Sequence, residues 1–265
     1  MPTPTLESLV ALVERLRAPD GCPWDRDQTL ADVRAYLLEE AHEVAGAIDG
    51  GDLDAIAAEL GDLLFQVTFV ASLVGEQGGA TLDRIIERIH DKMVERHPHV
   101  FGDEKLADTA AVNRAWETRK ARQAAPGESL LAGVPDSLPA LLTGYRLSQK
   151  AAGVGFDWPG VGGVLDKIEE EIEELRQQLE ATDAAPRDDL AEELGDLLFA
   201  LANLGRHLGI DPEGALARTN RKFRRRFRFI EESLATEGRR LEEADLEEME
   251  HLWNAAKELS AASDD

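Results

Sequence analysis

The chain has 265 residues and a formal net charge of −24. That charge argues against general binding of polymeric nucleic acid or anionic membranes, because both require a basic surface. The single cysteine, Cys22, excludes an intramolecular disulfide, so we expect a reducing compartment. Residues 1–10 lack a basic region followed by an apolar stretch, and no apolar run approaches the roughly 20 residues that span a bilayer. We therefore expect a cytoplasmic protein with no membrane segment.

Apolar residues follow helical spacing almost throughout, and no segment alternates convincingly as a strand. Two stripes that step by three and four are Val33, Leu37, Ala41, Val44 and Ile48, and Leu165, Ile168, Ile172, Leu175 and Leu179. Further helices are expected over residues 81–97, 110–123, 212–236 and 242–260. The pattern predicts an all-α fold.

The first half contains two acidic motifs on successive predicted helices. Glu39, Glu40 and Glu43 lie on the first, and Glu59 and Asp62 follow a helix stop at residues 49–52. Residues three apart on a helix are roughly 5–6 Å apart at Cβ, so Glu40 pairs with Glu43 and Glu59 with Asp62. If the helices pack antiparallel with these faces opposed, four carboxylates converge and require a cation between them. Oxygen ligands of this kind suit Mg²⁺ or Mn²⁺ rather than zinc.

The same arrangement recurs in the second half. The segment Glu-Leu-Gly-Asp-Leu-Leu-Phe occurs at residues 59–65 and again at 193–199. The helix before the second copy carries Glu170, Glu171 and Glu174, and aligning the two apolar stripes places Glu171 on Glu40 and Glu174 on Glu43. An isolated acidic pair is usually a solvated helix face. Two linked pairs, repeated beside an identical apolar run, favour a metal site in each half.

The repeat divides the chain into two helical domains of four to five helices each. Between Gln123 and Pro139 the chain has three prolines, two glycines and little periodicity, which is typical of a linker. We predict an N-terminal domain at residues 1–122, a linker at 123–137 and a C-terminal domain at 138–265.

Each half ends with cations and a tryptophan. Lys92, Arg96 and Trp116 in the first half match Lys222, Arg226 and Trp253 in the second, where the cations are far more numerous. On that second helix, helical geometry predicts a core stripe of Phe223, Phe227, Ile230 and Leu234, flanked by Lys222 and Arg226, with Arg221, Arg224 and Arg228 in solvent. Lys222 and Arg226 could clamp phosphate oxygens or could offset neighbouring acidic helices.

Four further motifs complete a specific ordered set. They are Cys22-Pro-Trp-Asp-Arg-Asp-Gln-Thr29, Arg96-His-Pro-His-Val-Phe-Gly-Asp103, Gly155-Phe-Asp-Trp158, and Asn220-x-Lys222-Phe223-x-x-Arg226-Phe227. Together with the acidic repeat, they resemble the MazG family of nucleoside triphosphate pyrophosphohydrolases, in its two-domain order and over nearly the whole chain. The resemblance implies Mg²⁺-dependent hydrolysis of ribo- and deoxyribonucleoside triphosphates to monophosphate and pyrophosphate, by a homodimer of tandem helical domains.

The resemblance also assigns roles to residues. It implies metal ligands Glu171, Glu174, Glu193 and Asp196 in the second domain, and Glu40, Glu43, Glu59 and Asp62 in the first. Glu170 and Glu39 precede these ligands and are candidates to orient or deprotonate water. Lys222 and Arg226 resemble phosphate contacts, with Trp253 and Lys257 near the nucleotide. Because the first domain has only Lys92 and Arg96 where the second has many cations, we expect the second domain to be the main catalytic unit.

Three functions stay open at this stage. The first is a broad pyrophosphohydrolase that cleans or regulates the nucleotide pool. The second is a non-catalytic module that binds nucleotide and metal for sensing or partner recruitment. The complete acidic quartets favour the enzyme. The third, a dedicated dUTP or phosphoribosyl-ATP hydrolase, fits the acidic motifs but not the tandem organisation.

Trp24 and Trp158 could contact a base or fill space between helices.

Overall fold

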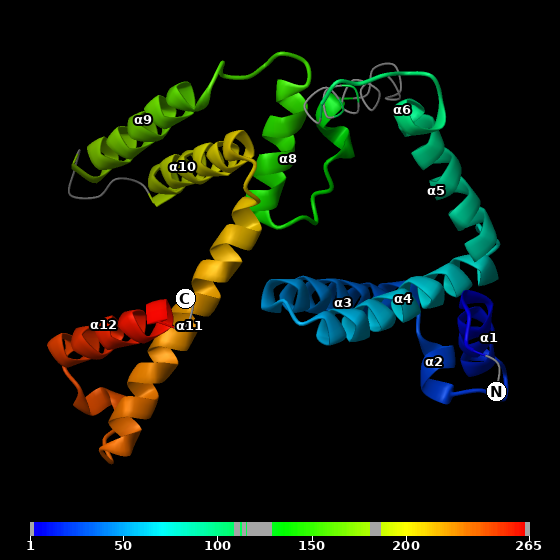
Figure 1. The fold of residues 1–265 in the computed structure, drawn as a ribbon, viewed down its shortest axis with the longest axis horizontal. Coiled ribbons are helices and arrows are strands. Elements are labelled where there is room, and N and C mark those ends of the chain that lie inside the picture. Colours follow the sequence, from blue (N-terminus) through cyan, green and yellow to red (C-terminus); the bar gives the residue numbers. More distant parts are fainter. Residues whose placement is uncertain (1–2, 109–111, 113–114, 116–128, 181–186, 263–265) are drawn as a thin grey trace. The chain divides into compact units, whose positions relative to one another are not determined.

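The computed structural model describes residues 3–108, 112, 115, 129–180 and 187–262, with side chains to residue 259 (Figure 1). The chain forms two compact units, Met1–Ala107 and Asp108–Asp265. Over the described ranges the regular structure is entirely helical, which confirms the expected all-α fold. The predicted domain boundary near residue 122 lies in a segment outside the described residues.

The core of unit 1 is an antiparallel pair of long helices with a shorter helix packed against one end. Its elements are α1 (Leu6–Arg17), α2 (Pro23–Asp27), α3 (Leu30–Gly50), α4 (Leu53–Glu76), α5 (Leu82–Arg96) and α6 (Pro98–Phe101). Helices α3 and α4 pack along each other, and α1 packs against α4. Val13, Val33, Phe69 and Leu73 form the buried core between them. Arg17 ties α1 to the end of α4 through two hydrogen bonds to the Glu76 carboxylate, at 2.7 and 2.8 Å.

A tight turn between α3 and α4 sets the register of the acidic motifs. Gly51 ends α3 with φ of 75°, a left-handed conformation that favours glycine, and its N–H donates to the carbonyls of Ala47 and Ile48. Asp52 then caps α4 by accepting from the Asp54 and Ala55 N–H groups. Glu43 and Glu59 are each eight residues from Gly51. An antiparallel hairpin therefore brings them opposite each other.

Unit 2 repeats this hairpin and extends it. Its elements are η1 (Leu130–Gly133), α8 (Ala140–Ala152), α9 (Val161–Glu180), α10 (Arg187–Leu208), α11 (Pro212–Thr236), η2 (Leu241–Glu243) and α12 (Leu246–Ala262). Helices α9 and α10 pack together around Val164, Ile168 and Ala200. Helix α8 approaches α10 closely at Gly144, where a Cβ would lie 3.2 Å from the Ala202 Cβ. Within the predicted linker, η1 packs on α8, and Lys150 Nζ donates to the Leu130 carbonyl at 3.0 Å.

Helix α11 leaves the carboxyl end of α10 and runs away from the α9–α10 pair (Figure 1). Gly209, with φ of 67°, ends α10, and Asp211 caps α11 ahead of Pro212 in its first turn. Helix α12 folds back along α11. The predicted bounds of α11, residues 212–236, are confirmed.

Some predicted core positions are wrong. Ile48, Leu165 and Leu179 are exposed, and so is Phe223. On α9 the buried residues are Val164, Ile168 and Glu171, so the buried stripe runs one residue before Leu165. Ile48 and Leu179 lie in the last turn of their helices. The helix predicted over residues 110–123, with Trp116, falls outside the described residues.

Helix α4 corrects the expectation that no helix is apolar enough for a membrane. By length and composition alone, Leu53–Glu76 could cross one. In unit 1, however, Phe69 and Leu73 of α4 belong to the buried core, and Glu59 near its start faces the carboxylates of α3. Core helices commonly share this composition, so α4 is weak evidence for a membrane segment.

Candidate metal centres

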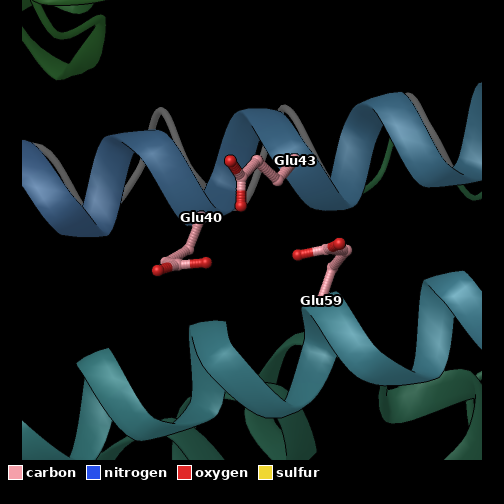
Figure 2. Close-up of side chains that lie close together, drawn as sticks. All are labelled: Glu40, Glu43 and Glu59. Atoms are coloured by element: carbon pink, nitrogen blue, oxygen red, sulfur yellow. The ribbon is translucent and has the colours of Figure 1, made fainter.

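Unit 1 gathers three carboxylates between α3 and α4. Glu40 and Glu43 project from α3 and Glu59 from α4 into the same space (Figure 2). One oxygen from each lies within 4.8 Å of the other two. Asp62 lies one turn further along α4. Burial raises the pKa of Glu40, and the charges of Glu43, Asp62 and Glu59 raise it further. The charge of Asp62 therefore reaches Glu40, although Asp62 lies outside the closest trio.

Unit 2 has an equivalent acidic centre, but the three carboxylates that lie closest together are not all equivalent to those in unit 1. Glu171 of α9 and Glu193 and Asp196 of α10 place one oxygen each within 4.8 Å of the others. Glu171 is only 3% exposed. Burial raises the pKa of Glu193, and Glu174 is the largest of the charges that raise it further. The fourth predicted ligand of each unit therefore acts electrostatically on one member of the trio: Asp62 acts on Glu40, and Glu174 acts on Glu193.

These centres fit a hard divalent cation. All donors are carboxylate oxygens, which Mg²⁺ and Mn²⁺ prefer. Oxygens that share one Mg²⁺ at about 2.1 Å are separated by about 3 to 4.2 Å, so small side-chain rotations within the 4.8 Å clusters suffice. Without a cation, burial and then the proximity of like charges disfavour the charged forms, which raises the pKa values of Glu40 and Glu193.

Lys167 is a feature of the unit 2 centre that the sequence reasoning missed. Its Nζ donates to Glu170 at 2.8 Å and lies 2.7 Å from the Glu171 carboxylate. The pKa of Lys167 is raised, first by the hydrogen bond to Glu170 and then by that to Glu171. The sequence signal for this contact is the spacing on one helix: Lys167 precedes Glu170 by three residues and Glu171 by four.

The predicted phosphate contacts assemble separately, on α11 and α12. The Arg226 guanidinium carbon lies 5.6 Å from the centre of the Trp253 ring, and Phe223 packs on the same ring at 5.1 Å. Arg226 Nε is buried without a hydrogen-bond partner. Lys222 is exposed one turn before Arg226, and Lys257 Nζ donates to Asn254 at 3.3 Å. These side chains form a basic and aromatic surface.

This surface lies apart from the acidic centre of its own unit. Helix α10 continues roughly 18 Å beyond Asp196 before α11 begins, at 1.5 Å per residue, and α11 then turns away. Neither Lys222 nor Arg226 forms an ion pair with the α9 or α10 carboxylates in the described part of the chain.

Of the two candidate base contacts, Trp24 lies in the short helix α2, and Trp158 lies in the connection that precedes α9. The Trp24 ring lies 5.9 Å from the ring of Tyr36 on α3, and Trp24 is exposed. Trp158 is also exposed, although its ring lies against Gly163 at the start of α9. Both roles considered for these rings, base contact and space filling, stay open.

Comparison with known proteins assigns the family. The model of the MazG nucleotide pyrophosphohydrolase domain matches residues 28–101 and 163–228. This chain belongs to the MazG family. The matched segments contain both acidic quartets, together with Lys222 and Arg226, and they confirm the tandem organisation.

Similarity to individual proteins extends over nearly the whole chain. The nucleoside triphosphate pyrophosphohydrolase of Escherichia coli (strain K12) is 44% identical over 255 residues, covering 95% of this chain and 97% of that protein. The nucleoside triphosphate pyrophosphohydrolase/pyrophosphatase MazG of Thermotoga maritima is 43% identical over 252 residues, covering 95% of each. An uncharacterised protein of Bacillus subtilis, YabN, is 44% identical over 254 residues, which is 96% of this chain and 52% of YabN.

Proposed function

We propose that this protein hydrolyses ribo- and deoxyribonucleoside triphosphates to monophosphate and pyrophosphate, with Mg²⁺ as its cofactor and unit 2 as the main catalytic unit. The observation that carries the proposal is the cluster of Glu171, Glu193 and Asp196 oxygens within 4.8 Å, inside a segment matched by the family model. Two full-length relatives named nucleoside triphosphate pyrophosphohydrolases support the same activity. We further propose broad base specificity, a housecleaning or regulatory role and a cytoplasmic location.

The residues of unit 2 divide the chemical work. Glu171, Glu174, Glu193 and Asp196 would hold Mg²⁺, which polarises phosphate oxygens and makes bound water more acidic. Glu170, which is exposed beside Glu171, would orient the attacking water or accept its proton. Lys222 and Arg226 would neutralise charge on the phosphates, and Trp253 would contact the nucleotide. No covalent nucleophile is needed.

Assembly as a homodimer is part of this proposal. Both units present the same apolar stripe on the second hairpin helix, with nearly equal exposure at equivalent positions. The pairs are Leu60 and Leu194 (49% each), Leu64 and Leu198 (46% and 44%), and Val67 and Leu201 (42% and 43%). Contiguous exposed apolar faces of this kind mark interaction surfaces. A second copy would cover them and could supply the cations that lie apart from the acidic centre within one chain.

The dimer has a direct test. We expect Leu64→Glu combined with Leu198→Glu to produce a monomer at micromolar concentration in sedimentation, because buried charge opposes association. Leu246→Glu, at an exposed position outside the stripe, is the control and should leave the dimer intact. A stable monomer in the unaltered protein would overturn this part of the proposal.

One assay tests the activity itself. Pyrophosphate release from eight ribo- and deoxyribonucleoside triphosphates is measured with Mg²⁺ and with EDTA. We expect turnover of several substrates with Mg²⁺ and its loss in EDTA, because the carboxylates alone repel the phosphates. Metal and nucleotide binding without turnover would instead favour the alternative function, a non-catalytic sensor or recruiting module.

A further inference from the structure

The unit 2 centre already contains a cation of the protein's own. Lys167 Nζ lies 2.7 Å from Glu171 Oε1 and donates to Glu170 Oε1 at 2.8 Å. Glu171 is 3% exposed, so its charge has little access to water. A buried carboxylate requires a partner, and Lys167 is the one it has among the described residues. One ligand oxygen of the predicted metal is therefore engaged by an ammonium group.

Unit 1 lacks this cation. The residue four positions before Glu40, equivalent to Lys167, is Tyr36, whose ring lies 5.9 Å from that of Trp24. No ion pair to Glu40, Glu43 or Glu59 is present in the described part of unit 1. The two acidic quartets have the same formal charge, but only the second has a neighbouring ammonium that offsets part of it.

We propose that Lys167 is an internal counter-cation that holds Glu171 in the metal-free state and competes with the divalent ion, so that unit 2 binds this ion more weakly than unit 1. The inference rests on the metal centres proposed above. An ion that enters unit 2 must displace the Lys167 ammonium group from the Glu171 oxygen. An ion that enters unit 1 displaces no cation and relieves the repulsion among the carboxylates. Lys167 also lowers the negative charge that attracts the ion.

The functional consequence is a division between the two centres. Weaker binding in unit 2 lets the ion arrive with the triphosphate and leave with pyrophosphate in each cycle. Tighter binding in unit 1 retains its ion between cycles and supports the α3–α4 hairpin. Lys167 is a positioning residue in this scheme, since it acts through Glu171.

The inference is tested by titrating the full-length protein with Mn²⁺ in a calorimeter, which measures the dissociation constant of each centre. Unit 1 is first silenced by Glu43→Gln with Glu59→Gln, and Lys167→Met is then added. We expect Lys167→Met to lower the dissociation constant of unit 2 by about twofold to fivefold, the range for a partly exposed ion pair. In the reciprocal protein, with unit 2 silenced by Glu193→Gln and Asp196→Asn, Tyr36→Lys should raise the dissociation constant of unit 1.

Arg176→Met is the matched control. It removes a positive charge from α9, but Arg176 pairs with exposed Glu173 at 3.6 Å, away from the centre. It should change the dissociation constant far less than Lys167→Met does. Lys167→Gln, which keeps a hydrogen-bond donor without the charge, should shift affinity in the same direction and serves as the second variant if Lys167→Met folds poorly.

Thermal unfolding supplies an independent readout. In EDTA, Lys167→Met should unfold at a lower temperature than the parent, and saturating Mn²⁺ should remove the difference. Unchanged or weaker Mn²⁺ binding in Lys167→Met and Lys167→Gln would overturn the inference while leaving the metal centre in place. Absence of Mn²⁺ binding in the unaltered protein would overturn the metal centre and the inference together.

Discussion

Asp196→Asn is expected to reduce kcat/KM for nucleoside triphosphates to less than a tenth of the unaltered value. If the substitution abolishes metal binding, we expect a reduction of about 100-fold. The substitution removes one charged ligand from the trio within 4.8 Å in unit 2. Loss of a ligand to a catalytic metal should cost several kcal/mol of transition-state stabilisation. Pyrophosphate release at saturating and limiting substrate measures the change.

The location of Asp196 makes this test clean. Its side chain is exposed, so replacement with an isosteric amide should leave helix content and unfolding temperature near those of the unaltered protein. Asp188→Asn, in the first turn of the same helix but outside the cluster, is the control and should retain activity. Retention of more than about a tenth of the activity by a folded Asp196→Asn protein would argue against catalysis at unit 2.

The acidic centres illustrate what local sequence can predict. Spacing of three residues places Glu40 beside Glu43, and a hairpin centred on Gly51 brings Glu43 opposite Glu59 without any long-range information. Both facts follow from helix geometry and a glycine turn. The structure therefore assembles these carboxylates as the sequence pattern indicates, although the metal they would hold stays a prediction.

Features that depend on helix rotation and direction were harder to predict. A rotation of one residue, about 100°, separates the expected stripe through Leu165 from the observed stripe through Val164 and Glu171. That rotation buries Glu171, and its burial makes Lys167 important. The direction of α11 depends on a short connection around Gly209 and Pro212, so apolar spacing could not show that Lys222 would lie apart from α9.

The same separation makes Lys222 informative. Mg-NTP carries about two negative charges near pH 7, so an acidic centre needs opposing cations to accept it. We expect Lys222→Ala to raise KM and lower kcat, with kcat/KM falling by about 10- to 100-fold, the scale of a charged phosphate contact. Lys92→Ala, at the equivalent position of α5, should have little effect in the full-length protein.

Steady-state kinetics of Lys222→Ala and Lys92→Ala decide whether unit 2 is the main catalytic unit. Arg224→Ala, which changes an exposed cation on α11, is the control. Lys222, Lys92 and Arg224 are all exposed, so truncation should not disturb folding. If Lys92→Ala is as damaging as Lys222→Ala, the asymmetry between the units is wrong. If none of the three variants changes kcat/KM, the cations of α11 are better explained as counter-charges, because a phosphate contact cannot be removed without loss of binding or turnover.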